Sequence, residues 1–384
     1  MCEGLAPASL RLLRLSLTNF RNYASLVWHP GARISVLFGP NGSGKTNLLE
    51  AISLLAPGRG LRGARNQEFA RRDPGSGLNW AVAARFATSD GPVEIGTGTP
   101  AEGPPDRRVF RLDGGVPRSQ AEIASRVAMV WLTPQMDRLF QEAPAGRRRF
   151  LDRLVWALEP GHARQVASHD AAMAGRNRLL AQAQPDGAWL TGLEDAIARH
   201  AVAATAARMA LVQRLDASLS GEGITGFPAV RVGLDGAIAA CLEKAPAIDV
   251  EDWIRRELSA LRGRDAASGS TSIGAHRCDL TLTDTLRGLP AALASTGEQK
   301  AMLVGLILAH AQLIEEARGL APLLLLDEPA VHLDPERRAA LFTGLRRLPA
   351  QTLITGTDAE FFSPLAGCAE LLRTGDGRLM PQSG

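Results

Sequence analysis

Three ordered segments of the chain carry residues whose types and spacing fit phosphate chemistry. The first matches the pattern G-x-x-x-x-G-K-[ST], in which the backbone N–H groups of a glycine-rich loop cradle phosphates. The third is an apolar strand that ends in two carboxylates, and the middle segment lies shortly before it, separated by a helix-length apolar stretch. In chain order they are Gly39-Pro40-Asn41-Gly42-Ser43-Gly44-Lys45-Thr46, Ser295-Thr296-Gly297-Glu298-Gln299-Lys300 and Leu323-Leu324-Leu325-Leu326-Asp327-Glu328.

The first segment stands in the context that a phosphate loop requires. A buried strand is predicted for 33–38 and a helix for 45–55, so the loop lies between a strand and a helix N-terminus. Lys45 would neutralise the β- and γ-phosphates of ATP, and the Thr46 hydroxyl would bind Mg²⁺. We therefore interpret Gly39–Thr46 as a nucleotide-binding loop.

The two carboxylates of the third segment suit a metal ion and an attacking water. Asp327 ends a hydrophobic strand, where a charge needs a partner, and Mg²⁺ reached through water is the natural one. Glu328 points elsewhere and is predicted to polarise the attacking water. A solvated turn is the alternative reading of two adjacent carboxylates.

The middle segment distinguishes this chain from most other phosphate-loop proteins. Its hydroxyls and backbone amides (Ser295, Thr296, Gly297, Glu298) precede a helix and form a second anion site; a plain capping box is the alternative reading. The order of the three segments is typical of ABC-type ATPases, in which this site acts in trans on the ATP of a second subunit. The sequence therefore predicts a homodimer that ATP closes and hydrolysis opens.

Three further residues are candidates by their position. Asp334, in the loop after the carboxylate strand, is predicted to cross the dimer seam and also to cap the helix that starts at Pro335. Gln135, after the strand at 127–132, is a candidate ligand of Mg²⁺ and sensor of the γ-phosphate. Thr357 occupies the usual position of a switch histidine, although a hydroxyl cannot act as a charged switch.

The elements around these segments predict an α/β fold. Short strands are expected at 10–17 and near Val27, an antiparallel sheet over 79–112, and a mainly helical stretch over 147–220 with a break at 184–187. We expect an ATPase head formed by 1–145 and 270–384, with a helical lobe at 146–269. The main helical stretch holds about 70 helical residues, or about 100 Å of helix folded back as a hairpin, which is too short for a coiled-coil arm.

Composition sets looser bounds. No apolar run approaches the roughly 20 residues that span a bilayer, and residues 1–17 lack a secretory signal. Four separated cysteines (Cys2, Cys241, Cys278, Cys368) indicate a reducing cytoplasm. A net charge of +3 is too small to indicate nucleic-acid binding by itself. Only three positive residues are lysines (Lys45, Lys244, Lys300), and two of them fall within the phosphate segments.

Several other residues permit two readings each. Arg147-Arg148-Arg149 forms either a solvated helix face or, with Arg59, Arg62 and Arg65, a set of contacts to DNA phosphates. His276 is structural more often than catalytic in such a setting. Tyr23 either stacks on a base or packs in the core.

The chain resembles the RecF family of bacterial recombination mediators over nearly its full length. The resemblance is carried by residues 19–23, 58–62, 134–152 and 274–277 together with the three segments above. Departures occur at Gln135, Glu142 and Val331, where the family has an acid, a glycine and a small residue. The first of these weakens the assignment of Gln135.

The resemblance implies an ABC-type (SMC/RecF-like) ATPase head with an antiparallel β subdomain and a short helical lobe. It also implies a weak, DNA-dependent ATPase that dimerises on ATP and binds double-stranded DNA at the junctions of single-strand gaps, in recombinational gap repair and replication restart. The implied partners are RecR and RecO, with which it would help load RecA.

Two other classes remain as alternatives. The nucleotide-binding subunit of a transporter or another ABC-type ATPase is usually shorter and keeps a charged switch residue. In a small-molecule kinase, residues 295–300 would be an ordinary helix cap.

Overall fold

The computed structural model describes residues 10–73, 77–100, 102, 104, 106–220 and 224–382. Cys2 and the first nine residues of the segment searched for a secretory signal lie outside this part. The chain forms two compact units, one of Met1–Asp137, Gly223–Pro228 and Ser295–Gly384, the other of Arg138–Glu222 and Ala229–Ala294. None of the helices in the described part combines the length and apolar character needed to cross a bilayer.

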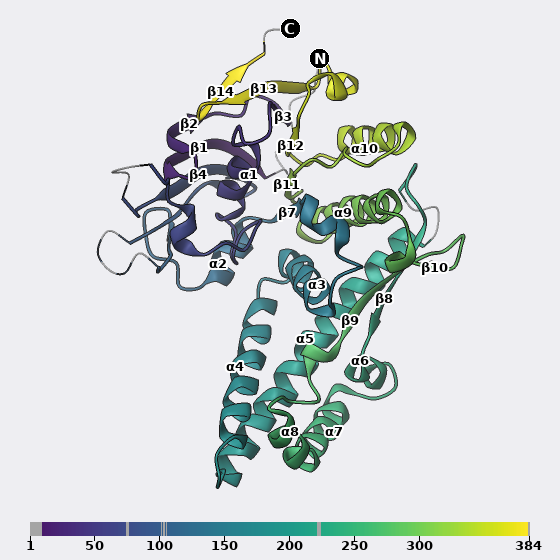
Figure 1. Cartoon of the computed structure of the whole chain (residues 1–384). Helices are drawn as coiled ribbons and strands as arrows, with labels where there is room; N and C mark the ends of the chain where they lie inside the picture. Colours follow the sequence, from purple (N-terminus) through teal and green to yellow (C-terminus); the bar gives the residue numbers. More distant parts are fainter. Residues whose placement is uncertain are drawn as a thin grey trace. The chain divides into compact units, whose positions relative to one another are not determined.

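A six-stranded, mostly parallel sheet forms the core of the first unit (Figure 1). In spatial order its strands are β14 (Arg378–Pro381), β13 (Ala369–Gly375), β3 (Ile34–Phe38), β12 (Thr352–Gly356), β11 (Leu323–Leu326) and β7 (Met129–Leu132). Only β14 runs antiparallel to its neighbour. The four leucines of β11 are all buried, as expected for a central parallel strand covered on both faces. Because parallel strands end at one edge, the loops after β3, β7, β11 and β12 meet there.

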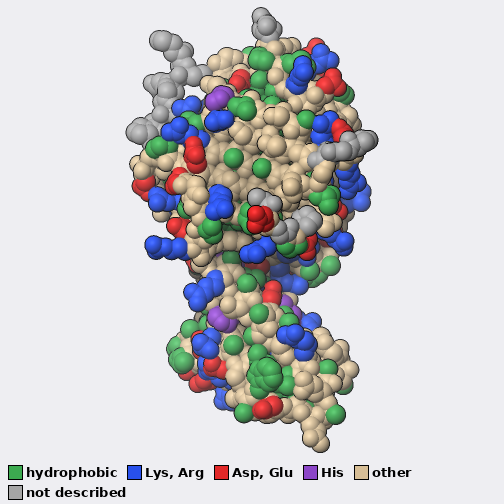
Figure 2. Space-filling view, turned by 90° about the vertical axis from the view of Figure 1, so that its left-hand side faces the viewer, with side chains coloured by type: hydrophobic (Ala, Val, Ile, Leu, Met, Phe, Trp, Pro, Cys, Tyr) green, Lys and Arg blue, Asp and Glu red, His purple; other side chains and the backbone are tan. Residues whose placement is uncertain are grey.

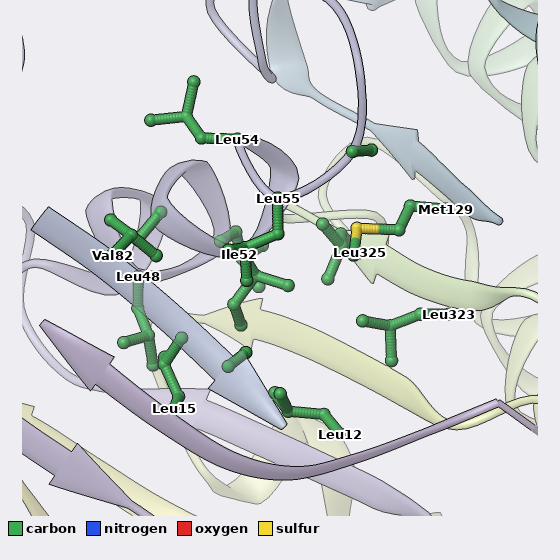
Figure 3. Close-up of a cluster of buried hydrophobic side chains, with 14 of the residues drawn as sticks. Leu12, Leu15, Leu48, Ile52, Leu54, Leu55, Val82, Met129, Leu323 and Leu325 are labelled. Carbon is green, nitrogen blue, oxygen red and sulfur yellow. The ribbon is translucent and has the colours of Figure 1, made fainter. Parts of the chain in front are cut away.

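An antiparallel sheet covers one side of the first unit. Its strands, in spatial order, are β2 (Tyr23–Trp28), β1 (Arg11–Phe20), β4 (Ala81–Thr88), β5 (Gly91–Gly98) and β6 (Val109–Leu112). The helix α1 (Lys45–Ser53) shares a buried cluster with both sheets, which includes Leu15, Val82, Leu48, Ile52 and Leu325 (Figure 3). This packing fixes the helix that follows the phosphate loop. The antiparallel sheet predicted from 79–112 is confirmed. It also contains β1 and β2, which come earlier in the chain.

The first unit also contains three further α-helices and three short 3₁₀ turns in its described part. They are α2 (Gln120–Arg126), α9 (Thr296–Arg318), α10 (Pro335–Arg347) and the short 3₁₀ turns η1 (Asn66–Phe69), η2 (Pro134–Arg138) and η5 (Glu360–Leu365). α9 is almost wholly buried from Gln299 to Ile314 and ends at Gly319, which adopts a left-handed conformation with φ 62°. The first turn of α9 therefore begins a helix whose body is anchored in the core.

The second unit consists of helices and a small antiparallel sheet. Its elements are α3 (Pro144–Leu158), α4 (His162–Leu180), α5 (Gly187–Leu219), β8 (Val230–Asp235), α6 (Ala237–Leu242), α7 (Ala247–Ala260), α8 (Arg262–Ser268), η3 (Ala275–Arg277), β9 (Asp279–Asp284), β10 (Leu289–Pro290) and η4 (Ala291–Leu293). α4 and α5 pack against each other as a hairpin, with the break at 181–186 and Asp186 capping α5 (Figure 1). At 33 residues, α5 is about 50 Å long.

The unit boundaries differ from the division expected from sequence. β9 and β10 pair with β8, so residues 270–294 belong to the helical unit, whereas the sequence placed them in the head. Residues 138–145 also join the helical unit, and 224–228 join the head. The boundaries differ because β8 and β9 pair although they are far apart in the sequence, and no local sequence pattern predicts such pairing. The functional division into head and lobe stays a proposal.

Candidate active site

The phosphate loop Gly39–Thr46 connects β3 to α1 as predicted. Gly44 is the N-cap of α1 with φ 106°, and no side chain caps the first turn, so its N–H groups remain available to an anion. A Cβ at Gly44 would lie 2.3 Å from Asn22 Nδ2, and one at Gly39 would lie 2.7 Å from the Thr374 carbonyl oxygen. Glycine is therefore required at both positions by conformation, and at Gly39 also by space, because the obstacle there is backbone.

The tip of this loop is exposed to solvent, whereas its lysine is buried. Pro40, Asn41 and Gly42 are exposed, whereas Lys45 is buried, and its ammonium donates to the carbonyls of Gly39 (2.7 Å) and Pro40 (3.0 Å). The pKa of Lys45 is lowered by burial, against the opposing attraction of the nearby acidic residues. Ser43 Oγ forms a 2.6 Å hydrogen bond with Thr374 Oγ1 and ties the loop to β13.

Two predicted metal ligands lie together at the carboxyl edge of the sheet. Thr46 Oγ1 donates to Asp327 Oδ1 at 3.0 Å, and Asp327 is only 3% exposed. A hydroxyl and a carboxylate oxygen are the donor types that Mg²⁺ prefers, and this ion usually takes few protein ligands alongside phosphate and water. The residues present therefore fit Mg²⁺.

Thr355 completes this pair and was missed by sequence reasoning. Its buried hydroxyl donates to Asp327 Oδ1 at 2.7 Å and accepts a 2.9 Å hydrogen bond from the Glu328 N–H. Leu326 and Ile354 are paired in register, which places Thr355 beside Asp327. The available signal was a threonine near the end of an apolar strand.

Glu328 has an uncommon backbone conformation. Its φ is 50°, in the left-handed region that non-glycine residues rarely adopt. Its N–H is held by Thr355, and its carbonyl accepts a 3.0 Å hydrogen bond from Lys300 Nζ. Both ends of the residue are therefore anchored.

The other two sensor candidates are placed less closely. Thr357 is exposed beyond the end of β12, two residues after the threonine that contacts the carboxylate strand. Gln135 is exposed on η2, and in the described part of the chain no hydrogen bond joins its side chain to Thr46 or Asp327. Their predicted roles remain predictions.

The middle of the three segments, Ser295–Lys300, is called the signature segment below, and it starts α9 with a complete capping box. Ser295 Oγ accepts from the Glu298 N–H at 3.3 Å, while the Glu298 carboxylate accepts from the Ser295 N–H at 2.9 Å and from its hydroxyl at 2.8 Å. Thr296 is the first residue of the helix. A Cβ at Gly297 would lie 2.8 Å from the His332 carbonyl oxygen, so the segment packs directly on the loop after β11.

That loop ends at Asp334. Its carboxylate accepts a 2.8 Å hydrogen bond from the Arg337 N–H and caps α10, as the sequence predicted. The residue is exposed, and its role at a dimer seam stays a prediction.

The basic candidates of the first unit lie in the segment between α1 and η1. Arg59, Arg62 and Arg65 are exposed, and Arg62 donates to Asn47 on α1 at 2.9 Å. On the face shown in Figure 2, Lys and Arg side chains are scattered among Asp and Glu. Tyr23 is fully buried and donates to the Gly44 carbonyl at 3.0 Å, so it packs against the phosphate loop and does not offer a stacking face.

The basic run of the second unit is largely engaged within that unit. Arg147 forms a two-pronged ion pair with Asp279, with both distances 2.7 Å, and Arg148 donates to the Cys278 carbonyl at 3.0 Å. Arg149 is exposed. His276 bonds the Thr271 carbonyl at 3.0 Å, and burial lowers its pKa to about 4, as a structural histidine requires.

Comparisons with known proteins cover almost the whole chain. The family model described as the RecF/RecN/SMC N-terminal domain matches residues 11–376. The DNA replication and repair protein RecF of Mesorhizobium japonicum is 48% identical over 377 residues, which is 98% of this chain and 99% of that protein. The RecF of Agrobacterium fabrum is 44% identical over 367 residues, or 95% and 97%.

Solved structures share the fold. The recombination mediator protein RecF-ATPrS in the RecFOR pathway matches with a TM-score of 0.85 at 22% identity, over 99% of this chain and 100% of that one. The Smc head domain of Pyrococcus furiosus with an extended coiled coil matches with a TM-score of 0.54 at 15% identity, over 97% and 96%. Both confirm an ABC-type, SMC/RecF-like head.

Proposed function

Because the chain belongs to the RecF family of DNA replication and repair proteins, we propose that it is a weak, DNA-stimulated ATPase whose ATP-bound dimer clamps DNA. The observation that carries this proposal is the 3.0 Å hydrogen bond between Thr46 and Asp327, with Glu328 next in the chain. This hydrogen bond brings the proposed phosphate loop, a proposed metal ligand and a candidate base together at one edge of the sheet.

ATP would lie along the loop, with its phosphates at the uncapped N-terminus of α1 and the Lys45 ammonium. Thr46 and Asp327 would hold Mg²⁺, which supplies charge stabilisation to the phosphates when bound. Gln135 is proposed as a further ligand. The Glu328 carboxylate would orient and deprotonate the attacking water, since its backbone is anchored on both sides.

Hydrolysis at this site would require a second copy. The signature segment is proposed to meet the γ-phosphate bound by the partner chain, with Asp334 at the seam. The names of solved relatives, RecF-ATP and RecF-ATPrS in the RecFOR pathway, support ATP as the nucleotide. The pathway in those names also supports RecR and RecO as partners, and RecA is proposed from the family resemblance.

The DNA would be duplex, at the junctions of single-strand gaps. Exposed arginines near α1 and Arg149 are the proposed contacts to phosphates. The role is proposed to be recombinational gap repair and replication restart in the cytoplasm.

Two variants test the clamp. Lys45→Ala should abolish nucleotide binding, because the phosphates lose their buried counter-charge. Glu328→Gln should bind Mg·ATP, stop hydrolysis and accumulate the dimer in gel filtration. Glu316→Gln, an exposed carboxylate on α9, is the matched control and should behave as the wild type.

The assay measures the ATPase rate and the mass with and without gapped duplex, across a salt series. Stimulation that falls steeply with salt is expected from phosphate contacts. A Glu328→Gln protein that stays monomeric in saturating Mg·ATP would overturn the clamp. Turnover stimulated by a metabolite but not by DNA would favour a kinase.

A further inference from the structure

Lys300 is a buried cation close to Glu328 that has no role in the hydrolysis proposed above. Its side chain is 1% exposed, and it is one of three lysines in a chain in which arginine supplies all the other Lys/Arg charges. Its ammonium donates to Asp137 Oδ2 at 3.0 Å and to the Glu328 carbonyl oxygen at 3.0 Å. A buried charge is costly unless it is paired and hydrogen-bonded, so both contacts are needed to hold it there.

The three groups come from three different parts of the site. Lys300 is the last residue of the signature segment and lies in the second turn of α9. Asp137 lies on η2, which follows β7, and Glu328 follows β11. The ammonium therefore links α9 to the loops that follow two neighbouring strands, β7 and β11.

The Lys300 ammonium contacts the backbone carbonyl of Glu328, and the backbone conformation there sets the direction of the Glu328 side chain. The residue is in the left-handed region, with its N–H fixed by Thr355 and its carbonyl fixed by Lys300. With both peptide groups held, the Cα–Cβ bond has one direction. Without the lysine, the carbonyl loses its donor, and the φ of 50° loses one of its two supports.

The lysine suits this position better than the arginine found elsewhere in the chain. A compact ammonium can direct separate hydrogen bonds at two acceptors, whereas a planar guanidinium needs more room and a fork-shaped partner. Asp137 Oδ2 is occupied, while Oδ1 is buried without a hydrogen-bond partner in the described residues. In the described residues the Asp137 carboxylate therefore accepts one hydrogen bond, from the Lys300 ammonium.

We propose that Lys300 is a positioning residue that fixes the Glu328 carboxylate of its own chain and couples it to the signature helix. The inference rests on the proposed function, since it assigns Glu328 to the water. It means that one helix acts on two sites: Ser295 on the nucleotide of the partner, and Lys300 on the base of the same chain.

The first experiment separates positioning from folding. Lys300→Met should lower kcat about 100-fold, the loss expected for a misplaced catalytic group, while the KM for ATP changes less than about threefold. Since this variant leaves Asp137 buried and unpaired, it is compared with Asp137→Leu/Lys300→Met. Replacing both partners of a buried ion pair with apolar residues restores stability.

The double variant decides between the two roles. If Lys300 only stabilises the fold, the double variant regains both its melting temperature and its kcat, and the inference is overturned. If it positions Glu328, stability returns and kcat stays low, because no donor reaches the carbonyl. A Lys300→Met protein with the melting temperature and the kcat of the wild type would also overturn it.

A second experiment asks which site Lys300 serves, using mixed dimers isolated through two affinity tags. With Lys45→Ala and Lys300→Met on the same chain and a wild-type partner, one complete site remains, and about half of the wild-type rate is expected. With the two substitutions on opposite chains, neither site is complete, and the rate should fall to that of Lys45→Ala. If instead the opposite-chain dimer were active and the same-chain dimer inactive, Lys300 would act on the partner's nucleotide and the inference would be overturned.

Ser295→Ala in place of Lys300→Met is the matched control. Acting in trans, it should give the opposite pattern, with activity only when it and Lys45→Ala are on opposite chains. If both arrangements of the Ser295 control are equally active, the shared-site dimer fails. The Lys300 inference then stands or falls on the kcat of the double variant.

Discussion

Thr355→Val removes one hydroxyl from the centre of the carboxylate edge and leaves the side chain's shape nearly unchanged. The hydroxyl is fully buried and makes two hydrogen bonds, to Asp327 Oδ1 at 2.7 Å and from the Glu328 N–H at 2.9 Å. Thr357, two residues on, is exposed and makes neither contact. Thr355→Val and Thr357→Val therefore test the same substitution at a buried and at an exposed position.

The expected cost follows from these contacts. A hydrogen bond to a charged group contributes about 1.5–3 kcal/mol, and a buried N–H left without a partner costs about 1–3 kcal/mol. The apolar methyl of valine offsets part of this, so Thr355→Val should lower the free energy of unfolding by about 3 kcal/mol. With a urea slope of about 3 kcal/mol/M, the unfolding midpoint moves by about 1 M. Thr357→Val should change stability by less than about 0.5 kcal/mol.

Urea unfolding of the full chain measures the stability, and ATP turnover at saturating Mg·ATP measures the function. We expect kcat to fall at least about 10-fold in Thr355→Val, because Glu328 loses the anchor on its N–H. Equal urea midpoints for the two variants would refute the assignment of Thr355. So would a larger loss of turnover in Thr357→Val, which would favour the residue chosen from sequence position.

Two further outcomes follow from buried groups. Burial lowers the pKa of His276 to about 4, below the value of about 6.5 in an unfolded chain, so its contribution to stability is complete above pH 6.5 and declines as the pH falls toward 4. Between pH 7.5 and 5.5 the loss should be about 1 kcal/mol, and urea unfolding of His276→Gln should show a smaller dependence over this range. Tyr23→Phe removes the 3.0 Å hydrogen bond to the Gly44 carbonyl, which should cost about 1 kcal/mol. Calorimetric titration should then show ATP binding weakened a few-fold, and unchanged affinity would mean that the hydroxyl does not support the loop.

The sequence predicted the parts of the site that are local in the chain. Gly39–Thr46 must connect a strand to a helix because its glycines and its flanking apolar runs allow little else. The Ser295 capping box and the Asp334 N-cap are also short-range patterns, and both are present. Elements of this kind are encoded within a few residues.

Contacts between strands distant in the sequence could not be derived in this way. Thr355 meets Asp327 only because β12 lies between β3 and β11, and strand order is not a local property. Counting residues beyond the strand led instead to Thr357, on the exposed side of the turn. Lys300 was recognised as unusual in an arginine-rich chain, but its two acceptors are 163 and 28 residues away.

The two readings of Ser295 use the same atoms, and this limits how the signature can act. Its N–H and hydroxyl both donate to the Glu298 carboxylate, which occupies the positions that phosphate oxygens would need. A phosphate could bind only by displacing that carboxylate, which it also repels, and losing a cap costs about 0.5–2 kcal/mol. A single chain therefore presents a weak anion site, and closure must draw on contacts with the second copy and on the full charge of the γ-phosphate. This favours a dimer that forms on ATP and separates after hydrolysis over one that is permanent.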